Sequence, residues 1–206
     1  MNDLPRFTGM LQAAVQRLQD KDFIHQARDT VSLRLPGEDA MLLWRDHGPV
    51  VLPLTGAEPG VAAVHAACYR QRPDAGAVAL LSPAWSLLLH QSGRPPVTLF
   101  DEQARHLGRP WRPWQTLPDK LLTGGNAGEL DGQLLVLGVT PRRMLFNAEL
   151  YEKCAKAAVL ANTTRHPVHR LPWWVCRIAA GRLRADQARA AASHRAGREA
   201  EELQAY

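Results

Sequence analysis

The sequence predicts one α/β domain in which short apolar strands alternate with amphipathic helices. The clearest indication is the stretch from residue 65 to 83, HAACYRQRPDAGAVALLSP, which reads as a helix, a turn, a buried strand and a second helix. Pro73, Asp74 and Gly76 supply the turn, and the apolar run 77–81 is the strand. A chain of 206 residues with 46% hydrophobic content is long enough for one sizeable core.

The chain before this unit contains one helix and three predicted strands. Residues 7–20 carry apolar side chains at helical spacing, which predicts an amphipathic helix on the outside of a sheet. Residues 30–35 alternate apolar and polar side chains, as a half-buried strand does. Pro36 and Gly37 then predict a hairpin to a strand at 40–45, and 48–54 is expected to be an edge strand because Pro53 lies near its end.

The chain after this unit is predicted to hold three helices and two strands. Residues 83–91 form a helix that stops before Gly93, and 96–100 form a short strand. Asp101 is a suitable N-cap for a helix over 102–107 that ends at Gly108. Residues 123–126 are read as a turn because they lack the phosphate-loop pattern. The last strand covers 132–138, and Pro141 starts a long helix that ends near residue 163.

The composition changes after residue 165, so we expect a C-terminal helical extension over 166–206, packed on the 1–165 domain or on a neighbouring subunit. Its helix is predicted over 182–203, with Gly197 inside it. That helix mixes acidic with basic residues, which argues against a nucleic-acid site despite the net charge of +5. The tryptophan-bearing segments at 111–114 and 171–175 would be awkward for a monomer to cover, which favours a homo-oligomer.

The N-terminus and the cysteines bear on the cellular compartment. The N-terminus lacks a basic segment followed by an apolar core, and no run reaches the length of about 18 apolar residues that a membrane span needs. Three widely spaced cysteines indicate reduced thiols rather than a disulfide framework. We therefore expect a cytoplasmic protein that does not associate with a membrane.

Nine residues in and around the central unit follow the pattern of a known family: His65, Ala67, Tyr69, Arg70, Arg72, Pro73, Asp74, Ala77 and Val78. The chain resembles the class II aldolase/adducin family, and the resemblance continues through 31–43, 100–108 and 131–158. It implies an α/β/α sandwich on a mainly antiparallel sheet, commonly assembled as a tetramer. Active members are metal-dependent sugar-phosphate aldolases, lyases or epimerases, whereas adducin heads share the fold without that chemistry.

The resemblance also implies where a metal site would lie, and this chain lacks its ligands. The positions of the family's three zinc-ligand histidines read Leu80, Ser82 and Asp131, and the acid/base glutamate position reads Val61. One carboxylate in place of three imidazoles is too poor a ligand set for zinc. We expect these four residues to converge on one place, with no metal and no other cofactor.

The sequence therefore favours a divergent, non-catalytic relative that acts by oligomeric assembly or by binding a protein partner or ligand. The alternative is an aldolase-like carbon–carbon lyase or an epimerase with a remodelled site. A third reading, nucleic-acid binding through the basic C-terminal arm, is the least favoured. The enzyme alternative would use catalytic candidates Glu102, His106 and Asp131 and ligand-binding candidates Ser32, Arg34 and Arg105.

Overall fold

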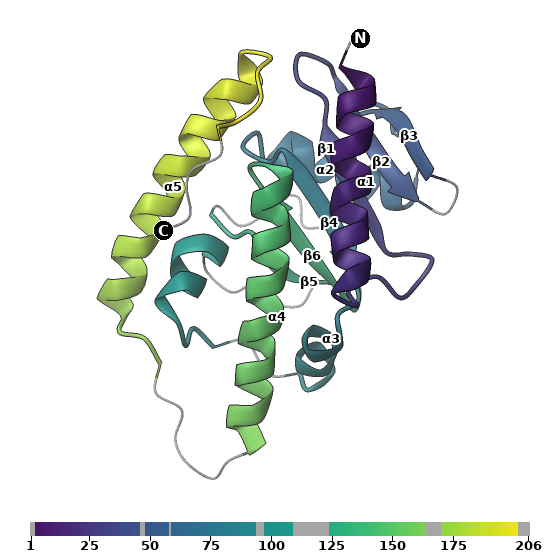
Figure 1. The fold of residues 1–206 in the computed structure, drawn as a ribbon. Helices are drawn as coiled ribbons and strands as arrows, with labels where there is room; N and C mark the ends of the chain where they lie inside the picture. The colour runs from purple at the N-terminus through teal and green to yellow at the C-terminus, as the bar shows by residue number, and fades with distance from the viewer. Residues whose placement is uncertain are drawn as a thin grey trace.

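The fold is organised around a six-stranded sheet in which every neighbouring pair of strands is antiparallel (Figure 1). A computed structural model describes residues 3–45, 48–57, 59–93, 97–108, 124–163 and 170–201. The strand order is β3-β2-β1-β4-β6-β5, so β1 and β4 are central. The strands are β1 (Thr30–Arg34), β2 (Ala40–Arg45), β3 (Gly48–Pro53), β4 (Ala77–Leu81), β5 (Ala127–Leu130) and β6 (Gln133–Gly138).

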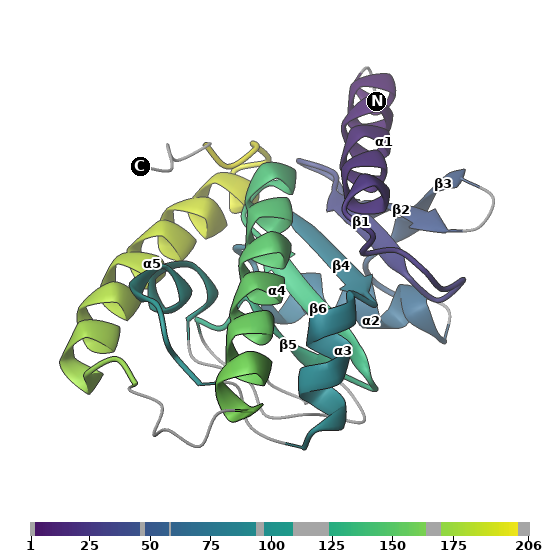
Figure 2. The same ribbon diagram turned by 60° about the horizontal axis from the view of Figure 1, so that its bottom comes forward.

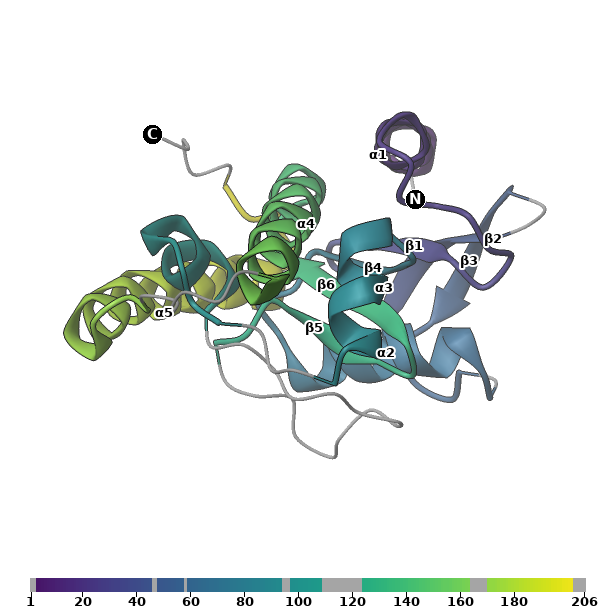
Figure 3. The ribbon, with the colours of Figure 1, turned by 90° about the horizontal axis from the view of Figure 1, so that it is seen from below.

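Helices cover both faces of this sheet, as Figure 3 shows. The helices α1, α3 and α4 pack on one face, and α2 packs on the other. The expected α/β/α sandwich is therefore confirmed. The helical elements are α1 (Leu4–Asp20), α2 (Val61–Gln71), α3 (Ala84–Gln91), the short π-helical turn η1 (Gln103–Leu107), α4 (Pro141–Thr163) and α5 (Trp173–Arg195).

The period-two alternation of β1 decides which side chains meet α2. Val31 and Leu33 point to the core beneath α1 and α4, where they meet Leu11 and Leu134. Thr30, Ser32 and Arg34 therefore project toward α2 on the opposite face. The polar members of the strand are thus buried under a helix rather than exposed to solvent, so each must find a hydrogen-bond partner there.

Two sequence predictions about strands need correction. Residues 97–100 form no strand; the backbone there is held by a bond from the Leu171 amide to the Thr98 carbonyl, 3.1 Å. Conversely, β5 was not predicted, because its sequence Ala-Gly-Glu-Leu is short and poor in β-branched residues. It forms through a tight hairpin to β6, in which Asp131 (φ 48°) and Gly132 (φ 74°) both adopt the left-handed conformation.

The C-terminal helix also differs from the prediction of 182–203. Helix α5 begins at Trp173 and ends at Arg195, so it includes the aromatic segment. Gly197 lies beyond the helix with φ of 70°, in the left-handed conformation that commonly ends helices. The turn η1 lies between α4 and α5 (Figures 1 and 2). The tryptophans at 111–114 and the start of the turn predicted at 123–126 lie outside the described residues.

A buried arginine connects the α2–β4 turn to three other parts of the fold. Arg72, only 5% exposed, donates from Nε and Nη2 to the two carboxylate oxygens of Asp74, at 2.8 and 2.7 Å. Its guanidinium also donates to the Gly125 carbonyl and to Asn126 Oδ1. Asn126 in turn donates to the His106 carbonyl (2.8 Å) and accepts from Gln187 Nε2 (3.1 Å). The turn, the start of β5, η1 and α5 therefore share one hydrogen-bond network.

Replacing Arg72 with methionine should lower the free energy of unfolding by about 3–5 kcal/mol, because the Asp74 carboxylate would be left buried without its partner. Chemical denaturation monitored by circular dichroism measures this loss. The matched control is Arg70→Met, on the same helix, an exposed residue whose guanidinium donates to the Leu54 carbonyl. That control should cost no more than about 1 kcal/mol. Equal losses for the two variants would contradict the assigned role of Arg72.

Candidate functional site

The four residues that the sequence resemblance singled out lie in or just after β4, at the start of α2 and in the β5–β6 turn. Leu80 is 4% exposed and packs in the α2-side core, and Val61 at the start of α2 packs against that core. Ser82 follows β4 and is fully buried. Asp131 occupies the exposed β5–β6 turn, where its carbonyl accepts a long 3.5 Å bond from Arg28. These four residues therefore comprise a buried leucine, a half-buried valine, a buried serine and one exposed carboxylate.

Ser82 hydrogen-bonds to the carboxylate of Asp29, and both oxygens of that carboxylate accept further hydrogen bonds. Its hydroxyl donates to Asp29 Oδ1 at 2.7 Å, and Gln133 Nε2 donates to the same oxygen at 2.7 Å. The other carboxylate oxygen of Asp29 accepts from the backbone amides of His25 and Gln26, at 2.8 and 2.9 Å. Asp29 is 5% exposed and receives four hydrogen bonds, so its charge is balanced by fixed donors rather than by a cation.

The available donors do not fit a zinc site. Zinc in proteins takes imidazole, thiolate or carboxylate ligands, usually at least three from the protein, and leucine supplies no donor at all. In the described ranges no three His, Cys, Asp or Glu side chains gather closely enough to hold a metal ion. Leu80 is packed in the core and Ser82 is hydrogen-bonded to Asp29, so neither side chain offers a ligand to zinc.

His65 lies on α2 beside this edge and is held as a neutral imidazole. Its Nε2 lies 2.9 Å from Thr30 Oγ1 and its Nδ1 lies 2.7 Å from Ser32 Oγ, so both ring nitrogens are hydrogen-bonded. Ser32 Oγ also lies 2.8 Å from the Tyr69 hydroxyl. Complete burial lowers the pKa of His65 to about 3 and raises that of Tyr69. These buried groups are hydrogen-bonded to one another, so both ring nitrogens of His65 have partners within the protein.

Arg34, a candidate anion binder, is engaged by the backbone of the α2–β4 connection. Its Nε donates to the Ala75 carbonyl and its Nη2 to the Tyr69 carbonyl, each at 2.8 Å. The guanidinium lies over the Tyr69 ring, 4.9 Å from the centroid. Burial lowers the pKa of Arg34 below its ordinary value. Arg34 therefore braces a turn, and Ser32 beside it is enclosed.

The three candidates near η1 lie in a different part of the molecule, beside α4 and α5. Glu102 pairs with Lys153 of α4 at 3.2 Å, and Arg105 pairs with Asp186 of α5 at 2.8 Å. His106 Nδ1 lies 3.1 Å from an Arg143 nitrogen, and its ring meets Phe146 edge to face. Burial, assisted by the neighbouring cation of Arg143, lowers the pKa of His106 to about 4.

The six candidate residues therefore lie in three different places. Ser32 and Arg34 face α2, whereas Glu102, Arg105 and His106 contact α4 and α5. Asp131 is at the hairpin turn, beside the residues that hold Asp29. The sequence reasoning did not single out Gln133, or Asp29 as a hydrogen-bond centre. Their partners are up to 104 residues away in the chain, so no local pattern could reveal them.

Comparison with known proteins gives the same picture of the fold. No family model matches the chain, and no curated protein matches it. Among solved structures, an L-fuculose 1-phosphate aldolase superposes with a TM-score of 0.71 at 16% identity, covering 85% of this chain and 94% of that one. The chain has the class II aldolase fold. No described helix is long and apolar enough to cross a membrane.

Two further structures support this assignment of the fold. The L-fuculose 1-phosphate aldolase of Glaciozyma antarctica PI12 has a TM-score of 0.67 at 15% identity, covering 93% of this chain and 90% of that one. An aldolase II superfamily protein of Pseudomonas syringae has a TM-score of 0.62 at 16% identity, with coverages of 85% and 83%. At these identities the likeness concerns architecture, and the activity must be argued from the residues.

Burial of a neutral His65 predicts a specific acid sensitivity. In the unfolded chain the imidazole binds a proton below its ordinary pKa of about 6.5, whereas in the folded protein it does so only near pH 3. Protons therefore favour unfolding, and the stability present above pH 6.5 declines as the pH falls. Between pH 7 and pH 4 the wild type should lose about 3 kcal/mol more than His65→Gln. Urea denaturation at several pH values measures this difference, and parallel pH profiles would contradict it.

Proposed function

We propose that this protein is a class II aldolase-fold protein without metal-dependent aldolase activity, which acts by assembly and by binding a partner. The observation that carries the proposal is the ligand set itself: Leu80, Ser82 and Asp131 stand where the resemblance implies three histidines. The hydrogen bond from Ser82 to Asp29 and the burial of Leu80 support it further, because neither side chain is available to a cation.

The missing ligands matter because the family's chemistry develops negative charge on the substrate. An enediolate formed during aldol cleavage needs electrostatic stabilisation. A bound metal ion typically contributes this stabilisation, on the order of several kcal/mol. Val61 offers no proton-transfer group, which commonly contributes roughly 10²- to 10⁴-fold in rate. The positions that the resemblance implies therefore supply neither the metal ligands nor the proton-transfer group.

The remodelled-enzyme alternative has less support from the side chains near η1. His106 contacts Arg143 and Phe146, and Glu102 lies on the surface, paired with Lys153, so the two do not face a common enclosed pocket that could serve acid–base chemistry. Arg105 forms an ion pair with Asp186.

A role for the chain in the cytoplasm fits its three free cysteines, of which Cys68 and Cys154 are buried.

Assembly is supported by an apolar strip on α5. Trp174 and Ile178 lie one helical turn apart and are 55% and 57% exposed, which is unusual for two such large apolar residues side by side. A second copy of the chain would bury them. The tetramer common in the family is the form we expect, with 166–206 as an extension that takes part in the contact.

Purified protein should carry no stoichiometric divalent metal and should not cleave L-fuculose 1-phosphate in a chelator-sensitive way. Elemental analysis by mass spectrometry and an aldolase assay with and without added zinc, cobalt and manganese measure these two properties. A metal-replete class II aldolase assayed in parallel is the positive control. One tightly bound metal per chain, or cleavage abolished by chelation and restored by metal, would refute the proposal.

Light scattering should give a homo-oligomer at micromolar concentration, and the double variant Trp174→Ser/Ile178→Ser should shift it toward the monomer. The matched control is Leu88→Ser on α3, which removes a similarly exposed apolar side chain (48%) away from α5. The control should leave the mass unchanged. A monomeric wild-type mass, or equal effects of the two variants, would contradict the role of the α5 strip.

A further inference from the structure

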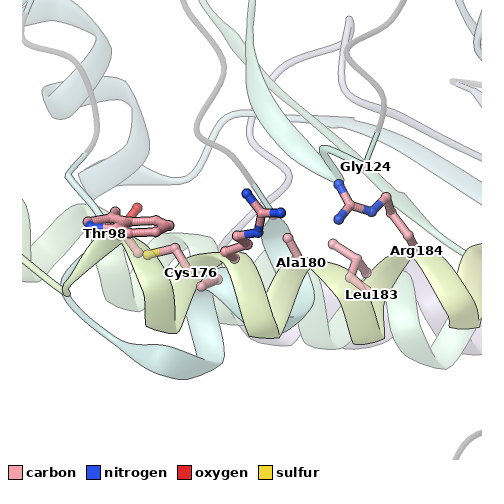
Figure 4. Close-up of a pocket in the computed structure, with 10 residues that line it drawn as sticks. Thr98, Gly124, Cys176, Ala180, Leu183 and Arg184 are labelled. Atoms are coloured by element: carbon pink, nitrogen blue, oxygen red, sulfur yellow. The ribbon is translucent and has the colours of Figure 1, made fainter.

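A groove follows α5 on the side that faces η1. Its volume is about 850 Å³, and its described lining comes from Thr98, from Ala104 and Gly108 at η1, from Gly124, and from α5. Figure 4 shows Cys176, Ala180, Leu183 and Arg184 along α5, with Gly124 opposite Arg184. The α5 residues of the lining run from Trp173 to Arg184, which at 1.5 Å per residue spans roughly 16 Å.

The groove is electropositive. Arg177 and Arg184 line it, two helical turns and therefore roughly 10 Å apart along the axis. Within the described residues neither makes an ion pair, and no acidic side chain lines the groove. The carboxylate that follows on α5, Asp186, is already shared by Arg105 and Arg189. Residues 170–185 contain four arginines and no aspartate or glutamate.

The groove also has apolar lining residues beside its two arginines. Trp173, at one end of the groove, is 73% exposed, although tryptophan is usually well buried. Cys176, Ala180 and Leu183 add small or apolar surface between the two arginines. The groove thus offers an aromatic anchor point at one end and two guanidinium groups along its length, a combination enriched at the energetic centres of protein interfaces.

We propose that this groove binds an acidic peptide segment of a partner protein. Two carboxylates of the peptide pair with Arg177 and Arg184, and an apolar side chain packs against Trp173. Carboxylates three residues apart on an extended peptide of polyproline-II type, in which every third side chain points the same way, or seven apart on a helix, match the spacing of roughly 10 Å. The inference rests on the partner-binding part of the proposed function and names the site and the chemistry of the partner.

The exposure of the lining favours a peptide over the other anionic ligands. Small-molecule sites enclose most of their ligand, whereas Trp173, Arg177 and Arg184 are all exposed. A membrane surface would need the basic and apolar side chains on an outward, convex face, but these line a hollow bounded by Gly108 and Gly124. An extended chain can lie along such a hollow and satisfy both arginines together.

Fluorescence anisotropy with the full chain tests the proposal. The probe is a labelled peptide in which glutamates spaced three apart alternate with leucine and phenylalanine, and lysines replace the glutamates in the control peptide. The acidic peptide should bind in the micromolar range and the basic peptide should not. Arg177→Glu/Arg184→Glu should weaken binding at least about tenfold, since each change turns an attraction into a repulsion. Trp173→Ser should weaken it as well.

The matched control is Arg182→Glu, an exposed arginine of the same helix that does not line the groove. It should change binding less than about threefold, the effect of a distant charge screened by salt. Equal weakening by Arg182→Glu would mean diffuse attraction and would overturn the proposal. So would failure of the acidic peptide to bind at 100 µM (on the order of the weakest useful affinity), or equally tight binding of inorganic phosphate.

Two more measurements distinguish the peptide from two other possible ligands of the groove, a membrane surface and a second copy of the chain. Binding to phosphatidylserine vesicles that Arg177→Glu/Arg184→Glu abolishes, without peptide binding, would assign the groove to a membrane and overturn the proposal. If the same variant dissociated the oligomer and the acidic peptide did not bind, the groove would be assigned to a second copy of the chain, and the proposal would again be overturned. Because metal content plays no part in these assays, their failure leaves the proposed loss of aldolase activity untouched.

Discussion

The buried guanidinium of Arg72 is the constraint on which the arrangement of the outer elements depends. A buried charge is costly unless its hydrogen bonds are complete, so the positions of Asp74, Gly125 and Asn126 follow from it. Asn126 in turn hydrogen-bonds to the backbone of η1 and to Gln187 of α5, so the positions of these two helices depend on it as well. Arg72 and Asp74 of the α2–β4 turn, which carry part of the sequence resemblance, thus serve the scaffold.

A second polar network occupies the place where the chemistry of the fold would be expected. Asp29 collects hydrogen bonds from Ser82, Gln133 and two backbone amides, while His65 closes a chain with Thr30, Ser32 and Tyr69. These groups find their hydrogen-bond partners within the protein, and such complete networks hold the surrounding core rigid. On α5, by contrast, tryptophan, isoleucine and arginine side chains are exposed.

Local patterns predicted most of the sheet and the inner helices. Strands β1, β2, β3, β4 and β6 were expected within one or two residues, because alternation or apolar runs bounded by turns mark them. The strand predicted at 96–100 was wrong, and β5 was missed because its pairing comes from the hairpin rather than from its own residues. The extent of α5 was misjudged because the tryptophans looked like a separate segment.

The candidate site was less accessible to sequence reasoning than the fold. The resemblance identified Leu80, Ser82, Asp131 and Val61 as altered positions, but the substitute network depends on contacts between residues such as Asp29 and Gln133 that are far apart in the chain. Charged candidates on η1 looked available in the sequence, and only the structure shows Arg105 and Glu102 engaged by partners on α5 and α4. The periodicity of a sequence predicts helices and strands, but it does not predict which polar side chains from distant parts of the chain form pairs.

The central claim is that the end of β4 cannot hold a divalent cation, and paramagnetic relaxation tests it most directly. Nuclear magnetic resonance spectra recorded with stepwise Mn²⁺ or Co²⁺ should leave the methyl groups of Leu80 and the amide of Ser82 unbroadened, and the His65 imidazole nitrogens should keep the shifts of a neutral ring. Selective broadening of Leu80 and Ser82 at substoichiometric metal would show a cation bound there and would contradict the account.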